Sequence, residues 1–286
     1  IWLKFNYLKE KDKNAFILGG TQANLTGVEW TKAVLEAGLK DVIDAYSIHF
    51  YNHTALPETG GILDKTRNIA EIIHSYNPDL EIWLDESGEF STIEQGLESR
   101  KHTLEDQAAF VPRLYMILEN DGVVDRQYWY DYINDGDNLS NAEHNYGLLK
   151  SGTNISGAYA AKPSYLATAF MNKMVMEGKH VELNVVEEKE RYINRYKLND
   201  GKDMLVCWSV DNKNTVAIKS QNSVDAYDLY GNYLGKLNPV DGVLNIQLSY
   251  QPIYLVGNVP QTEICEPTVM CYNGYAEAVI NDAYEI

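Results

Sequence analysis

Short apolar runs alternate with amphipathic stretches along the first 176 residues of the chain. Four of these runs have the length and the β-branched or aromatic content of strands, and they lie at 15–18, 45–51, 81–84 and 126–132. Each is followed by a stretch whose apolar residues recur at helical spacing, near 28–39, 67–76, 103–119 and 163–176. The pattern therefore predicts four consecutive β–α units.

Consecutive β–α units with short apolar strands are typical of a parallel sheet covered by helices. An open, doubly wound sheet is the competing arrangement, but the chain has no Gly-x-Gly-x-x-Gly motif that opens a helix. We therefore predict an α/β fold in which residues 1–176 form a (β/α)8 TIM barrel or half of one.

The periodicity changes beyond residue 177. Short strands separated by turn signals are expected at 192–198, 204–210, 215–218, 224–229, 244–248 and 253–256. Their spacing predicts an antiparallel β-sandwich domain at 177–258. Residues 259–286 have no clear period, and we interpret them as a linker or the start of a further module. Within them, Cys265 and Cys271 could form a disulfide if the protein is exported.

The composition excludes several classes of protein. Hydrophobic residues make up 45% and charged residues 23% of the chain, which is typical of a globular protein with a sizeable core. The net charge of −17 would repel phosphate backbones and anionic membranes, so we expect neither nucleic-acid nor membrane binding. No apolar run reaches the roughly 18 residues of a membrane span. The chain begins at Ile1 without a Met or a leader, and we expect it to be a piece of a longer protein.

Five short motifs carry a resemblance to a known family. They are His49-Phe-Tyr51, Trp83-Leu-Asp-Glu-Ser-Gly88, Gln107-Ala108, Tyr128-Trp-Tyr130 and Lys162-Pro-Ser-Tyr165. In this order and spacing they resemble the C-terminal half of clan A glycoside hydrolases, with family 39 and family 5 enzymes the most similar. The segments 228–232 and 252–255 resemble the accessory β-sandwich that follows the barrel in several of those families.

The resemblance implies that the four units are the C-terminal four of a (β/α)8 barrel and that the enzyme is retaining. The clan has its nucleophile, a Glu, at the end of the seventh strand, which implies Glu86 here. Its sixth strand supplies a His and a Tyr near the sugar, which implies substrate binding by His49 and Tyr51. Its eighth strand supplies an aromatic platform, which implies Trp129. Asn52, directly after Tyr51, is a further substrate-binding candidate.

The chemistry of these residues agrees with the implied roles. A retaining glycosidase uses two carboxyl groups about 5–5.5 Å apart. Asp85 and Glu86 are not expected to be that pair, because neighbours on a strand point to opposite faces. Glu86 is favoured because it lies at the C-terminal strand end, where barrel enzymes carry out catalysis. Tyr51 could donate a hydrogen bond that favours the ionised form of Glu86, and Trp129 could offer an apolar face to a sugar.

Simpler interpretations exist for each candidate. Glu86 could be a solvated strand-end carboxylate, His49 a core histidine, and Trp129 a side chain that fills the barrel. The segment 131–136 weakly resembles a calcium loop, but Ile133 occupies a ligand position. We therefore expect no metal site and no cofactor.

The clan's general acid, a Glu that follows an Asn at the end of strand four, has no match in this chain. We therefore expect a partner segment, either the N-terminal half of the barrel or a second copy, to complete the site. Without it, the large apolar side chains of Ile17, Ile48, Leu84 and Trp129 are expected to face water. The prediction from sequence is a secreted or periplasmic glycoside hydrolase that acts on a poly- or oligosaccharide. The alternative is a non-catalytic carbohydrate-binding or scaffolding protein on a degenerate barrel.

Overall fold

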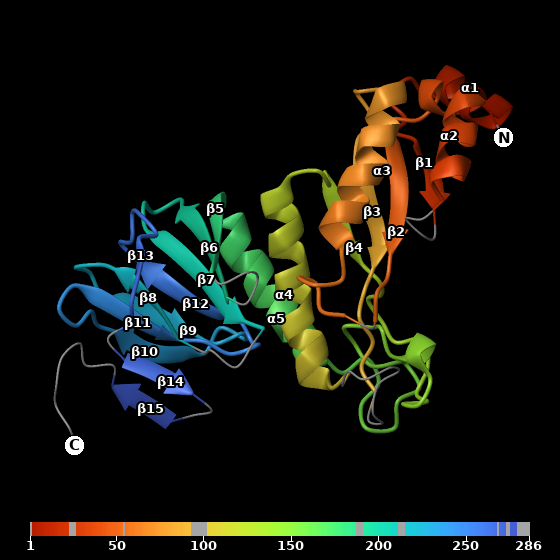
Figure 1. The fold of residues 1–286 in the computed structure, drawn as a ribbon. Helices are drawn as coiled ribbons and strands as arrows, with labels where there is room; N and C mark the ends of the chain where they lie inside the picture. Colours follow the sequence, from red (N-terminus) through yellow and green to blue (C-terminus); the bar gives the residue numbers. More distant parts are fainter. Residues whose placement is uncertain are drawn as a thin grey trace. The chain divides into compact units, whose positions relative to one another are not determined.

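The computed structural model describes residues 2–22, 27–53, 55–92, 102–186, 191–210, 215–267, 269–272 and 275–278. They form two compact units, which are described separately below (Figure 1). The first unit contains residues 1–110 and 117–160, and the second contains residues 111–116 and 161–286. The domain boundaries expected after residues 176 and 258 remain predictions.

The first unit is built on a parallel sheet with the strand order β1-β2-β3-β4. Its strands are β1 (Leu18–Gln22), β2 (Ala45–Phe50), β3 (Glu81–Ser87) and β4 (Arg126–Trp129). Its helices are α1 (Trp2–Lys11), α2 (Val28–Glu36), α3 (Ile62–Tyr76) and both ends of α4 (Leu104–Asp121), whose residues 111–116 belong to the second unit; η1 (Leu39–Asp41) and η3 (Ala142–His144) are short 3-10 turns. The predicted parallel sheet is confirmed, and α1 was not expected.

One strand lies later than its pattern indicated. The apolar run at 15–18 was expected to be the first strand, whereas β1 begins at Leu18 and continues through Gly19 and Gly20. These residues carry no strand signal of their own, and their pairing with β2 defines the strand. The carboxylate of Asp44 accepts hydrogen bonds from the Ile17 amide and the Lys9 ammonium, at 2.7 and 2.8 Å, just before β1.

The two faces of this sheet differ from expectation. Ile17, Ile48 and Leu84 were expected to face water, but all three are buried within the chain. The aromatic residues Phe16 and Trp83 are chain neighbours of buried ones and point to the other face. Phe16 is 52% exposed and stacks on the ring of Trp83, with 5.1 Å between centroids. Tyr128, 44% exposed, also lies beside the Trp83 ring, at 5.7 Å between centroids. Side chains alternate between the two faces of a strand, so residues that are one position apart lie on opposite faces. Ile17 and Leu84 are therefore on the covered face, and Phe16 and Trp83 are on the other.

The second unit is antiparallel apart from its helix α5 (Pro163–Met176), which begins with the proline predicted at its first turn. Its largest sheet has the strand order β10-β9-β12-β7-β6-β5. These strands are β5 (Gly178–Val186), β6 (Arg191–Leu198), β7 (Asp203–Ser209), β9 (Val224–Tyr227), β10 (Tyr233–Leu237) and β12 (Ile253–Gly257). A smaller sheet, β11-β8-β13, contains β8 (Thr215–Lys219), β11 (Val243–Gln247) and β13 (Ile264–Cys265).

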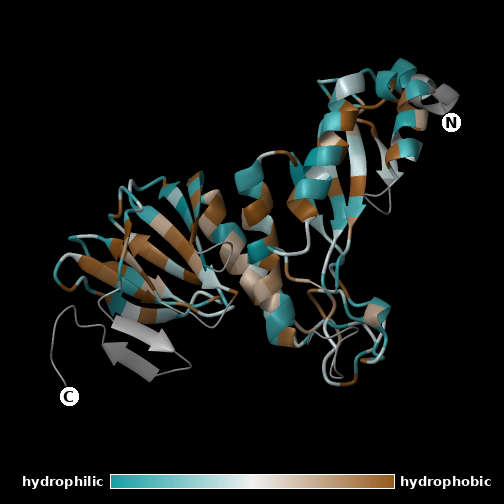
Figure 2. Cartoon of the chain, in the orientation of Figure 1, coloured by the Kyte–Doolittle hydropathy of each residue, from teal (hydrophilic) through white to brown (hydrophobic). Residues whose placement is uncertain are grey.

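The six strands predicted for this part are all present, and the edge strands β5 and β10 were missed. Both edges have alternating or exposed side chains and therefore little apolar signal. The two antiparallel sheets share one hydrophobic cluster, which includes Ile193, Leu205, Ile218 and Leu244. Such shared burial stabilises the pairing of the two sheets. Hydrophobic stretches run along strands of this unit (Figure 2).

The segment expected to be a linker or a further module begins by packing onto this unit. Val259 is buried in the shared cluster, and β13 pairs with β8. A separate hairpin follows, formed by β14 (Val269–Tyr272) and β15 (Tyr275–Ala278). Cys265 is free, so the disulfide considered for it is not formed. Cys207 is fully buried, and burial raises the pKa of its thiol, which makes the thiol unreactive.

Within the described ranges, no helix has the length and apolarity required to cross a bilayer.

Candidate active site

The candidate site lies where strands β2, β3 and β4 end. These strands are parallel, so their carboxyl ends meet at one edge of the sheet and bring Tyr51, Glu86 and Tyr130 to the same place. The amide of Tyr130 donates to the Ser87 carbonyl at 2.8 Å, which continues the pairing of β3 and β4 to this edge. Gly88 follows directly, against the Tyr130 backbone, where a Cβ would collide with the carbonyl oxygen.

A bulge in β3 determines how the two adjacent carboxylates point. Ile48 pairs with Leu84 and His49 with Glu86, so Asp85 is the extra residue between them. As a result, both carboxylates contact the His49 imidazole, Glu86 at Nδ1 and Asp85 at Nε2, the latter at 3.3 Å. The two carboxylates reach the same imidazole although they are neighbours on the strand, because the bulge interrupts the alternation of side chains.

Glu86 and Asp85 nevertheless differ in their surroundings. Asp85 also accepts a hydrogen bond from the Ser47 hydroxyl at 2.8 Å, and Ser47 is completely buried. The Glu86 side chain is 28% exposed and that of Asp85 23%, so the hydrogen bond from Ser47 is the main difference between them. The Glu86 carboxylate is therefore both held by a neighbour and reachable from solvent.

Tyr51 is the second neighbour that holds Glu86. Its side chain is hydrogen-bonded to the Glu86 carboxylate. Burial raises the pKa of the Tyr51 phenol far above its ordinary value, and the negative charge of Glu86 raises it further. The phenol therefore stays protonated and can donate to the carboxylate, while the substrate-binding role expected for Tyr51 remains a prediction.

Two further tyrosines pack around Tyr51 and form, with it, a wall beside Glu86. The Tyr51 ring meets the edge of Tyr146 at 5.7 Å and of Tyr130 at 6.4 Å, and the rings of Tyr130 and Tyr146 are 5.5 Å apart. Burial, and then a hydrogen bond to Asp135, raise the pKa of Tyr130 to about 12. We refer to Tyr51, Tyr130 and Tyr146 as the tyrosine wall.

Trp129 and Asn52 lie at the same edge of the sheet, and their hydrogen bonds are to backbone carbonyls. The Trp129 indole donates to the Tyr146 carbonyl at 3.1 Å, and its ring meets the edge of Phe110 at 6.3 Å. The Asn52 amide donates to the Gly60 carbonyl at 3.0 Å and closes the loop after β2. The substrate-binding roles expected for both residues remain predictions.

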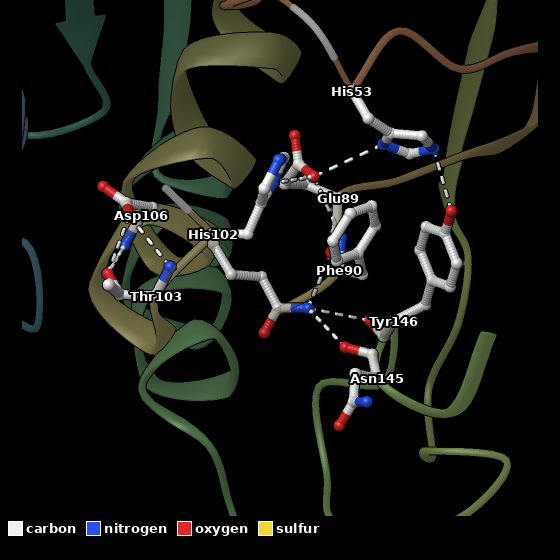
Figure 3. A network of polar contacts seen from close by, with 9 residues as sticks. His53, Glu89, Phe90, His102, Thr103, Asp106, Asn145 and Tyr146 are labelled. Atoms are coloured by element: carbon white, nitrogen blue, oxygen red, sulfur yellow. Dashed lines mark hydrogen bonds and ion pairs between the residues drawn. The ribbon is translucent and has the colours of Figure 1, made fainter. Parts of the chain in front are cut away.

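A buried network next to the tyrosine wall was not found from the sequence (Figure 3). Glu89, three residues after Glu86, is completely buried and contacts two imidazoles, His102 at 2.7 Å and His53 at 3.3 Å. The amide of Gln107 donates to the carbonyls of Glu89 and Tyr146, at 2.7 and 3.0 Å.

The position of Gln107 follows from a local signal. Helix α4 begins with a capping box in which Thr103 and Asp106 satisfy each other's backbone amides, and Gln107 lies one residue later. The motif Gln107-Ala108 was part of the sequence resemblance, whereas the participation of His53 and His102 has no sequence signal that we recognise.

A groove on the described surface lies elsewhere. It has a volume of about 550 Å³ and is lined by residues that precede β3 and β4, among them Arg67, His74 and Asp125. It lies at the amino ends of the strands, opposite Glu86, and contains no residue of the candidate site. Among the described residues, no group of three or more His, Cys, Asp or Glu side chains could hold a metal ion.

Residues 3–160, which contain the whole candidate site, match the family described as glycosyl hydrolase catalytic core. The match covers more than half of the 286 residues, so the chain belongs to this family. The resemblance to clan A glycoside hydrolases indicated by the five motifs is thereby confirmed.

Solved structures share the fold. A family 39 glycoside hydrolase from the gut symbiont Bacteroides cellulosilyticus WH2 is 24% identical with a TM-score of 0.72, over 89% of this chain and 53% of that one. A glucosidase from Croceicoccus marinus is 11% identical with a TM-score of 0.61, over 90% and 63%. A GH51 arabinofuranosidase from Xanthomonas axonopodis pv. citri is 11% identical with a TM-score of 0.53, over 84% and 57%.

The chain therefore spans 53–63% of the length of these three structures. No curated protein is significantly similar in sequence.

Proposed function

We propose that the complete protein is a retaining glycoside hydrolase that cleaves O-glycosidic bonds of a poly- or oligosaccharide, with Glu86 as its nucleophile. The observation that carries the proposal is the environment of Glu86: a reachable carboxylate at a strand end, held by the Tyr51 phenol and the His49 imidazole. Membership of the glycosyl hydrolase catalytic core family supports it.

In the proposed first step, a Glu86 oxygen attacks the anomeric carbon while the bond to the leaving oxygen breaks, which gives a covalent glycosyl-enzyme. In the second step, water attacks the same carbon and releases Glu86 and a sugar of retained configuration. Tyr51 would stabilise the carboxylate before attack and after release, since its hydrogen bond is strongest to the charged form.

The general acid would come from a partner segment. We propose that this partner is the N-terminal half of a (β/α)8 barrel, whose strands would close on the present sheet and cover its exposed aromatic residues. Phe16 and Tyr128 beside Trp83 support this, because exposed aromatic stacks are costly unless another surface covers them. The antiparallel sheets would form the accessory β-sandwich, and a secreted or periplasmic location would suit a polysaccharide substrate.

The test compares the complete protein with its Glu86→Ala and Glu86→Gln variants on a panel of aryl glycosides. Both variants should lose on the order of 10⁴-fold in turnover, since both displacement steps use Glu86. Azide should restore activity to Glu86→Ala and give a glycosyl azide of inverted configuration, because only one displacement then remains. Turnover like that of the unaltered protein in either variant would exclude Glu86 as nucleophile.

The same assay distinguishes the alternative. Activated aryl glycosides, whose leaving phenols need no protonation, report on the nucleophile without the general acid. If the unaltered complete protein binds sugars but cleaves neither activated nor ordinary glycosides, the non-catalytic carbohydrate-binding interpretation is favoured instead.

A further inference from the structure

The buried carboxylate of Glu89 determines the direction of a chain of hydrogen bonds. Its Oε1 contacts Nδ1 of His102 at 2.7 Å and Nδ1 of His53 at 3.3 Å (Figure 3). An ionised carboxylate can only accept hydrogen bonds. With Glu89 ionised, both imidazoles carry a proton on Nδ1 and donate it to Glu89.

This arrangement leaves Nε2 of a neutral His53 as an acceptor. The Tyr146 hydroxyl lies 2.8 Å from that nitrogen, and it is therefore the donor in this contact. A phenol has a single proton, so the Tyr146 proton is committed to His53. The chain of hydrogen bonds runs from Tyr146 to His53 to Glu89.

The chain connects three segments that the strand ends position separately. His53 follows β2, Glu89 follows β3, and Tyr146 lies in the long connection after β4. The rings of His53 and Tyr146 are also in contact, at 5.6 Å between centroids, and Phe90 packs against the His53 ring at 4.9 Å. The chain thus fixes the rotation of Tyr146 relative to the sheet edge.

Tyr146 transmits this constraint to the catalytic edge. Its ring packs edge-on against Tyr51, whose phenol holds Glu86. We infer that Glu89, acting through His53, positions Tyr146 so that the tyrosine wall keeps the Tyr51 hydroxyl on the Glu86 carboxylate. Glu89, His53 and Tyr146 are then positioning residues for the nucleophile, and this role rests on the proposed function.

The decisive variant is Tyr146→Phe, which keeps the ring and removes only the hydroxyl. The matched control is Tyr132→Phe, an exposed tyrosine of the same connection. In the complete protein, the burst of phenol from an activated aryl glycoside measures attack by Glu86 directly. Tyr146→Phe should slow the burst by about 10- to 100-fold, the usual effect of a residue that orients a reacting group, with KM changed less than about twofold.

Two results would overturn the role. One is a Tyr146→Phe burst as fast as that of Tyr132→Phe. The other is a rise in KM with an unchanged burst, which would indicate general loosening of the site. If the Glu89→Gln variant folds, it should slow the burst as much as Tyr146→Phe does. If Glu89→Gln does not fold, the burst of Tyr146→Phe alone tests the positioning role.

A second measurement does not depend on activity. Nitrogen-15 NMR of the six histidines, with His53 assigned by its loss in His53→Gln, should show His53 as the neutral tautomer protonated on Nδ1. Tyr146→Phe should change its Nε2 shift, and Tyr132→Phe should leave it unchanged. An Nε2-protonated His53 would overturn the chain even if the enzyme is active. If the unaltered protein cleaves no glycoside, the proposed function fails and the positioning role fails with it, while the NMR result still decides the hydrogen bonds.

Discussion

The two closest neighbours of Glu86, His49 and Tyr51, also contact other side chains, and these contacts restrict the position of the Glu86 carboxylate. His49 lies between the carboxylates of Glu86 and Asp85, and Tyr51 lies between Glu86 and the other rings of the tyrosine wall. Neither neighbour can move without changing a second contact. The candidate nucleophile is therefore held in a preorganised position, as catalytic groups require.

The hydrogen bond from Tyr51 should be visible in kinetics. Tyr51→Phe in the complete protein should lower kcat/KM by about 10- to 100-fold, since a hydrogen bond to a charged group contributes roughly 1.5–3 kcal/mol. The control is Tyr76→Phe, because the Tyr76 hydroxyl donates to the exposed Glu36 carboxylate away from the site. Equal rates for the two variants would show that the Tyr51 hydroxyl does not assist Glu86.

The raised pKa of Tyr51 also predicts a dependence of stability on pH. The folded protein keeps the Tyr51 proton at a pH where the unfolded chain, with a pKa near 10.0, loses it. The contribution to stability is therefore complete below pH 10 and is lost as the pH rises further. Thermal unfolding from about pH 9 to about pH 11 should show a smaller fall in Tm for Tyr51→Phe than for the unaltered chain. A parallel fall in both would contradict the assignment.

At the scale of elements, the join between β3 and β4 is the critical feature. The bulge at Asp85 and the close approach of Gly88 to the Tyr130 backbone place Glu86 and Tyr130 at one edge. The sequence predicted β3 only as far as Leu84, because the apolar pattern ends there. Pairing with β2 and β4 extends the strand to Ser87 and includes both carboxylates.

Gly88→Ala tests this join. The added Cβ would collide with the Tyr130 carbonyl, a backbone atom that cannot rotate away, so we expect a loss of about 1–3 kcal/mol in the free energy of unfolding together with reduced activity. Gly178→Ala is the control, since its Cβ would meet a flexible Leu198 methyl at 3.0 Å. Denaturant titration of both variants measures the difference. An unaltered midpoint for Gly88→Ala would show that the strand ends have room to separate.

At the scale of the whole molecule, the sheet of the first unit has one face with exposed aromatic side chains. Phe16 stacks on Trp83 there, the Tyr128 ring lies tilted to Trp83, and the Arg126 guanidinium is 5.1 Å from the Trp83 ring centre. Leaving large apolar side chains in water costs roughly 1.5–3 kcal/mol each. A covering segment would remove this cost.

The isolated 286-residue chain is therefore expected to self-associate or to bind a barrel segment supplied separately. Size-exclusion chromatography with mass detection should show this, and Trp83→Ser should weaken the association. The control is Tyr233→Ser, at an exposed aromatic residue of the second unit. A well-folded monomer that binds no added segment would contradict the expected partner.

The sequence by itself determined the local elements and led to the proposal of Glu86 as nucleophile. Periodicity predicted the parallel strands and the antiparallel ones, Lys162-Pro163 predicted the start of α5, and a carboxylate after an apolar strand predicted Glu86. These features depend on neighbours within a few positions of the chain, where spacing and backbone preference act directly.

Only the tertiary structure decided which face of the sheet is covered, where the bulge falls, and how Glu89, His53 and Tyr146 meet. His53 and Tyr146 are 93 positions apart, and His53 and Glu89 are 36 positions apart. A hydrogen bond between such residues leaves no periodic trace in the chain, because its geometry is set by strand pairing and loop packing. Burial of Ile48 and exposure of Phe16 likewise follow from which side the helices occupy, and the pattern of apolar residues alone fits either side.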